Sequence, residues 1–169
     1  MENRMLRKNT QDRPGVAKAL DASRAAPAPV IFVAVLLVGV LLSLAFPVSF
    51  FPRVITLLVG AACFLLPFLL GLAALRAMHR ARTGVNPNRP TTVLLTGGPF
   101  RLSRNPMYLG MVVQYVGLAL LFNSLWAIVL LPLALVVVHL TVIKREEWCL
   151  EQKFGQEYRA YKARVRRWI

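Results

Sequence analysis

Four long apolar runs constrain this chain more than any other feature of its sequence. They cover Val30–Phe46, Val54–Leu75, Pro106–Phe122 and Leu125–Ile143, and 57% of all residues are hydrophobic while only 17% are charged. The first run has 17 residues, and a helix of that length spans about 25 Å, close to the thickness of the hydrocarbon core of a bilayer. The sequence therefore predicts an all-α integral membrane protein with four transmembrane helices.

The basic residues are confined to the connections on one side of these runs. Of the 21 lysines and arginines, 20 lie in the tail 1–29, the connection 76–105 and the segment 144–169, whereas the opposite turns carry only Arg53. Because basic loops stay on the cytoplasmic side, both termini are predicted to be cytoplasmic, with the protein in the inner, cytoplasmic membrane. The formal net charge of +14 then fits contact with anionic membrane lipids better than nucleic-acid binding, so no nucleic-acid partner is predicted.

The same pattern divides the chain into three parts. Residues 1–29 are predicted to be a loosely ordered cytoplasmic tail, with a short interfacial helix over residues 15–25 as the less favoured alternative. Residues 30–143 form the four-helix core and include the cytoplasmic loop 76–105. Residues 144–169 are predicted to form amphipathic helices that lie along the membrane surface.

The final segment carries an apolar stripe at helical spacing. Phe154, Tyr158, Tyr161, Val165 and Trp168 follow one another at intervals of four, three, four and three residues, which places them on one face of a helix. Gly155, inside this stripe, can mark a break between two shorter helices.

Two polar segments attached to apolar runs carry the candidate chemistry. The first, GGPFRLSRNPMYLG at residues 97–110, ends in Asn105 and Pro106, which are typical of a helix N-cap followed by proline at the first helical position. Arg101 and Arg104 are therefore expected just outside a helix start, where free backbone N–H groups already favour an anion.

The second polar segment, KREEWCLEQKFGQEYRAY, begins where the fourth apolar run ends and contains Glu146 and Glu147. Two arginines and two carboxylates at one membrane surface can hold a ligand that carries both charges. Adjacent residues on a helix point about 100° apart, so we expect one glutamate to bind the ligand and the other to orient an arginine or the 97–105 backbone. The alternative is a salt bridge, for example between Arg104 and Glu147, with no ligand.

The pair GPFRLSRNPMYLG and REEWCLEQKFGQEYRAYKARVRRWI resembles the isoprenylcysteine carboxyl methyltransferase and phospholipid methyltransferase superfamily of integral membrane enzymes. The resemblance implies binding of S-adenosylmethionine, with S-adenosylhomocysteine as product, between the third helix start and the fourth helix end, with residues 144–169 completing the cofactor site. The cofactor-site positions that it implies are Gly98, Pro99, Arg101, Arg104, Asn105, Pro106, Tyr108, Leu109, Gly110, Glu146 and Glu147. A histidine often stands in the family where this chain has Asn105, so an acid–base role at that position is weakened.

Arg104, Glu147 and His139 are the candidate catalytic residues. His139 lies within the fourth apolar run, where an ionisable side chain is either functional or a neutral histidine bonded to a neighbouring helix. The methyl acceptor is expected to be lipophilic or membrane-resident, and a prenylcysteine carboxylate, a phospholipid amine and a small thiol all remain open. Only an amine requires a proton acceptor, for which His139 or a glutamate is available.

A non-enzymatic membrane protein, such as a small transporter or an assembly factor, is the competing interpretation. Transporters usually show internal repeats, and this sequence has none. Cys63 and Cys149 have neither disulfide nor metal-ligand spacing, so no metal site is predicted. No feature of the sequence indicates an oligomeric state.

Overall fold

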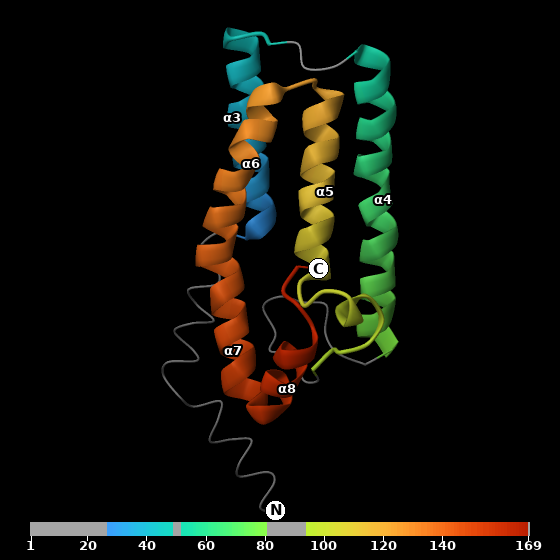
Figure 1. The fold of residues 1–169 in the computed structure, drawn as a ribbon, viewed down its shortest axis with the longest axis vertical. Coiled ribbons are helices and arrows are strands. Elements are labelled where there is room, and N and C mark those ends of the chain that lie inside the picture. Colours follow the sequence, from blue (N-terminus) through green and yellow to red (C-terminus); the bar gives the residue numbers. More distant parts are fainter. Residues whose placement is uncertain (1–26, 49–51, 81–93, 169) are drawn as a thin grey trace, which may run out of the picture.

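The computed structural model describes residues 27–48, 52–80 and 94–168, and within these ranges the chain is helical with no strand (Figure 1). The predicted tail helix and the loop segment 81–93 lie outside the described residues. The elements in chain order are α3 (Ala28–Ala45), α4 (Arg53–Arg80), the 3₁₀ turn η1 (Gly98–Arg101), α5 (Pro106–Leu121), α6 (Leu125–Val138), the π-helix η2 (His139–Ile143), α7 (Lys144–Phe154) and α8 (Gln156–Arg164).

Two pairs of helices make the closest contacts in the bundle: α4 packs along α5, and α3 packs along α6 (Figure 1). Glycine permits both contacts. A Cβ atom on Gly117 of α5 would lie 2.6 Å from the backbone nitrogen of Phe64 in α4, and one on Gly39 of α3 would lie 2.5 Å from the Cα of Ala127 in α6. Small residues let helix backbones approach in this way inside a membrane.

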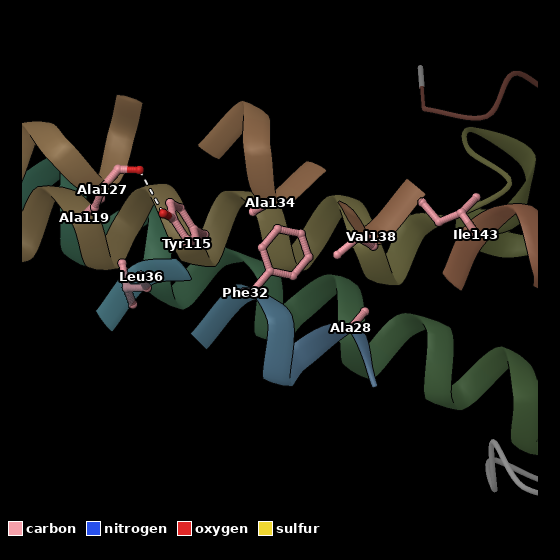
Figure 2. Packing of buried hydrophobic residues seen from close by; sticks show 9 residues of the cluster. All are labelled: Ala28, Phe32, Leu36, Tyr115, Ala119, Ala127, Ala134, Val138 and Ile143. Carbon is pink, nitrogen blue, oxygen red and sulfur yellow. Dashed lines mark hydrogen bonds between the residues drawn. The ribbon is translucent and has the colours of Figure 1, made fainter. Parts of the chain in front are cut away.

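A core between α3, α5 and α6 joins the two pairs (Figure 2). The rings of Phe32 and Tyr115 lie 6.0 Å apart between centroids, and the Tyr115 hydroxyl donates a 2.8 Å hydrogen bond to the carbonyl oxygen of Ala127. Ser124 caps the start of α6 by accepting a hydrogen bond from the Ala127 amide. The buried members are Ala28, Phe32, Leu36, Tyr115, Ala119, Ala127, Ala134, Val138 and Ile143.

The outer surface of the bundle is strongly apolar. Leu44 on α3 and Leu58 on α4 are 76% and 69% exposed, a pattern that is stable only against lipid or another apolar surface. Of the helices in the described chain, Ala28–Ala45 and Leu125–Phe154 are long and apolar enough to cross a membrane, while Arg53–Leu69 and Pro106–Leu121 are shorter apolar segments. The described part of the chain is therefore all-helical and membrane-associated, and the four spans stay a prediction.

The helix ends differ from the predicted ones in three places. α4 continues to Arg80, five residues past the predicted end, and Pro67 lies inside it without ending it. Residues 125–154 form one continuous helical run, so α7 extends α6 instead of turning onto a separate surface helix (Figure 1). The predicted break at Gly155 is present, but α8 ends at Arg164, so Val165 and Trp168 do not continue its helical face.

Candidate active site

The segment before α5 folds into a tight turn that presents Arg104 and Asn105. The backbone N–H groups of Leu102 and Ser103 both donate to the carbonyl oxygen of Pro99, which closes η1. The chain then enters α5 with Pro106 at the first helical position, as predicted.

Asn105 occupies the N-cap position, but the predicted side-chain cap is wrong. Its side chain forms no cap hydrogen bond, and its backbone N–H donates to the hydroxyl oxygen of Ser103 at 3.1 Å. The side-chain Nδ2 of Asn105 is buried and has no acceptor among the described residues. The amide group of Asn105 is thus a free donor at the start of α5.

Residues 165–168, which we call the C-terminal strap, run back from α8 to the lower end of α5 (Figure 1). The backbone N–H of Arg104 donates to the carbonyl oxygen of Arg166 at 3.0 Å, and the hydroxyl of Ser103 donates to the carbonyl oxygen of Arg167, also at 3.0 Å. These bonds fix the strap against the turn that carries Arg104.

Two tyrosines of α8 reinforce this attachment. Gly155, with φ of 51°, reverses the chain after α7 and allows Tyr158 and Tyr161 to be buried. The Tyr161 hydroxyl donates a 2.7 Å hydrogen bond to the carbonyl oxygen of Phe100 in η1. Burial raises the pKa of Tyr161 to about 12, so this hydroxyl stays protonated and remains a donor at neutral pH.

Glu147 is the centre of a partly buried ion cluster. Its Oε1 and Oε2 accept hydrogen bonds from Nε and Nη2 of Arg167 at 2.8 and 2.7 Å, and Nη1 of Arg104 lies 3.2 Å from Oε1. The side chains of Arg104 and Glu147 are each only 10% exposed. Burial alone would raise the pKa of Glu147, but the Arg167 hydrogen bonds and the charges of both arginines outweigh it and lower that pKa.

Glu146 has a different environment from its neighbour. Its Oε1 accepts a 2.8 Å hydrogen bond from the hydroxyl of Tyr108 on α5, while the side chain remains reachable from solvent. Desolvation by the surrounding protein raises the pKa of Glu146, and the Tyr108 hydrogen bond opposes this rise. The two glutamates therefore face different partners, as the 100° rotation between adjacent helical residues predicts.

These segments line a small open hollow of about 110 Å³, below the range of about 300–1,000 Å³ that is typical of small-molecule sites. Nε and Nη1 of Arg104 and Nδ2 of Asn105 are buried without a hydrogen-bond acceptor in the described part of the chain. Unpaired buried donors are costly, so the hollow suits a ligand with acceptor oxygens. Its walls are Leu94, Leu95, Phe100, Arg104, Asn105, Glu146, Glu147, Leu150, Tyr158 and Tyr161.

The structure brings together some of the predicted site residues and leaves others apart. Arg104, Asn105, Glu146 and Glu147 line the hollow, and Tyr108 reaches it through Glu146. The other predicted positions do not line it: Gly98, Pro99, Arg101, Pro106, Leu109, Gly110 and the catalytic candidate His139.

The positions outside the hollow have other places in the fold. Arg101 is exposed. Gly110 is buried against Pro67, and a Cβ added to this glycine would lie 3.5 Å from the Cβ of Pro67. His139 is the half-buried first residue of η2. The Arg104–Glu147 salt bridge, which the sequence offered as the alternative to a ligand site, is present, but it is buried and shared with Arg167.

Several residues around the hollow were not predicted. Tyr158 and Tyr161 were expected on an apolar face, and their burial confirms that face, but nothing in their spacing indicated a site. Arg167 had no distinguishing signal, because it is one of eight basic residues in the segment 144–169. The two leucines that follow the undescribed part of the loop, Leu94 and Leu95, likewise carried no signal.

Comparison with known proteins agrees with this arrangement. An uncharacterized protein of Haemophilus influenzae is 38% identical over 63 residues, which are 37% of this chain and the whole of that protein. No solved structure matches the chain. The family model of phospholipid methyltransferases matches residues 55–157, from the start of α4 into α8, and so includes Arg104 and both glutamates. The chain belongs to the phospholipid methyltransferase family.

Proposed function

We propose that this membrane methyltransferase uses S-adenosylmethionine and transfers the methyl group to a lipophilic or membrane-resident acceptor. In this proposal α3, α4, α5 and the α6 part of the long helix all cross the membrane, with both termini and the hollow on the cytoplasmic side. The apolar outer surfaces of the four helices and the clustering of basic residues at one end support this topology.

The unpaired donors in the hollow are the observation on which the cofactor assignment rests. Nε and Nη1 of Arg104 and Nδ2 of Asn105 are buried without acceptors among the described residues, and an arginine fork suits a carboxylate. Glu146 offers an acceptor for an ammonium group or a ribose diol. S-adenosylmethionine carries a carboxylate, an ammonium group and a diol, so these residues fit it.

When bound, S-adenosylmethionine supplies an electrophilic methyl group beside a sulfonium charge. The protein's own part is to bind, orient and exclude water. Arg104 and Asn105 hold the carboxylate end, and Leu94, Leu95 and Phe100 give the hollow an apolar wall. Alignment of the reacting atoms supplies much of the rate in such displacements, and a water-poor wall adds to it.

The acceptor decides whether a base is needed. A carboxylate or a thiolate needs none, whereas an amine must lose a proton. Glu146 is better placed for that role than His139, because it lines the hollow and desolvation raises its pKa. A phospholipid amine, a prenylcysteine carboxylate and a small thiol are the candidate acceptors.

Calorimetry with S-adenosylmethionine on the detergent-purified protein tests the cofactor assignment. Arg104→Ala should weaken binding by tenfold or more, at about 1.4 kcal/mol for each factor of ten, while Arg101→Ala, the exposed matched control, should not. If both variants bind S-adenosylmethionine as tightly as the wild type does, the proposed site is wrong.

Incubation of the protein with methyl-labelled S-adenosylmethionine and membrane lipid or thiol extracts, followed by mass spectrometry, identifies the acceptor. A labelled lipid or thiol is the expected product. Cofactor binding without any labelled product would favour the non-enzymatic alternative, a transporter or an assembly factor.

A further inference from the structure

The C-terminal strap lies outside residues 55–157, the part of the chain that the family match covers, yet it contributes the shortest contacts of the ion cluster. Nε and Nη2 of Arg167 bind both oxygens of Glu147 at 2.8 and 2.7 Å. A bidentate, charge-assisted pair of this kind fixes the orientation of a carboxylate as well as its charge.

This pairing determines what Arg104 can bind. Because Arg167 occupies both oxygens of Glu147, Arg104 approaches only Oε1, at 3.2 Å, without hydrogen-bond geometry at Nη1. Nε of Arg104 therefore has no acceptor among the described residues, and Nη1 has only the ion pair with Glu147. The three groups carry two positive charges and one negative charge, so an anion from the ligand would neutralise the cluster.

We propose that Arg167 is a positioning residue: it engages Glu147 so that the guanidinium of Arg104 remains available for an anionic group of the ligand, and it holds the strap against the turn before α5. The ligand part rests on the proposed function, in which that anion is the carboxylate of S-adenosylmethionine. The strap part rests only on contacts within the chain.

Without Arg167, Glu147 would turn to the remaining arginine. Its carboxylate could then accept both hydrogen bonds from Arg104 and consume the donors that face the hollow. Arg166 offers no substitute, because it contributes its backbone carbonyl to the strap while its side chain is exposed. Arg166→Ala is therefore the matched control for Arg167→Ala.

The test uses the full chain in detergent with two measurements. Calorimetry with S-adenosylmethionine reports ligand binding, and hydrogen-exchange mass spectrometry reports the Arg104 amide, which donates to the strap at Arg166. Arg167→Ala should weaken binding about tenfold or more and speed exchange at Arg104. Arg166→Ala should change neither, and Arg167→Lys should recover only part of the binding, because lysine lacks the bidentate fork.

Several results would overturn the proposal. Wild-type affinity in Arg167→Ala, with or without faster exchange, would show that Arg167 does not act on the ligand site. Full recovery of binding in Arg167→Lys would show that the positive charge alone is sufficient, and it would refute the positioning role. If the wild type itself binds no S-adenosylmethionine, the proposed function fails, and the exchange rate at Arg104 alone then decides whether Arg167 holds the strap.

Discussion

Glu147→Gln is the most informative single change for the energetics of the site. Glutamine keeps the size of the side chain and one carbonyl oxygen, but it loses the negative charge between Arg104 and Arg167. One of the two charge-assisted hydrogen bonds from Arg167 is lost, which costs about 1.5–3 kcal/mol. The two guanidinium groups also lose their shared counter-charge, although Arg167 is 32% exposed and water screens part of this effect.

We therefore expect Glu147→Gln to lower the free energy of unfolding by about 2–3 kcal/mol, below the 3–5 kcal/mol found when a fully buried ion pair loses one partner. Reversible unfolding in mixed micelles, followed by the loss of helical circular dichroism, measures this difference directly. The measurement needs no ligand, so it is independent of the proposed function.

Glu151→Gln is the matched control, one turn further along α7. Glu151 pairs with Arg159 and Lys162, whose side chains are 60% and 41% exposed, and exposed ion pairs contribute about 1 kcal/mol or less. If Glu147→Gln destabilises the protein no more than Glu151→Gln does, the ion cluster does not stabilise the fold and the reasoning above is refuted.

Three further results are expected from the same unfolding assay. Gly117→Ala should destabilise the protein by about 2 kcal/mol or more, because its Cβ would overlap the α4 backbone at 2.6 Å; no change would show that the α4–α5 contact is loose. Gly155→Ala should cost about 1–2 kcal/mol through its positive φ alone, since its Cβ would meet open space. The pKa of Glu147 is lowered by folding, so its contribution to stability should be complete above the ordinary value of 4.5 and should fade as the pH falls below it; Glu147→Gln should remove that acid dependence.

The sequence was sufficient for the features that follow from local chemistry. The apolar runs located α3 and α5 to within two residues at each end, because few other residues can sit in a lipid-facing helix. Pro106 fixed the start of α5, and Gly155 fixed the break between α7 and α8. The meeting of Arg104 with Glu147 was inferred from two segments about forty residues apart, and the structure confirms that contact.

The sequence was insufficient where tertiary contacts decide. Asn105 has the residue type of a capping side chain, yet its side chain makes no cap hydrogen bond, and its own backbone N–H donates to the hydroxyl oxygen of Ser103. In the sequence, Arg167 looks like any other basic residue of the segment 144–169. Its place in the site becomes visible only in the structure, where the chain reverses at Gly155. α4 runs on to Arg80 because the five residues after Leu75 include alanine, methionine and two arginines, which are good helix formers, so the end of the apolar run was not the end of the helix.

The π-helix η2 has a consequence for the angular setting of the two glutamates. A π turn holds one residue more than an α turn, and here it stands between the apolar run and α7. The five residues of η2 turn the chain through about the same angle as four residues of α-helix. Deleting one residue from His139–Ile143 would therefore let an ordinary helix run straight through, with Glu146 and Glu147 still facing their present partners. Deleting one residue from the ordinary helix of α6 would instead swing both carboxylates by about 100° around the axis, so the π turn is a place where the helix can lose a residue without turning the site away.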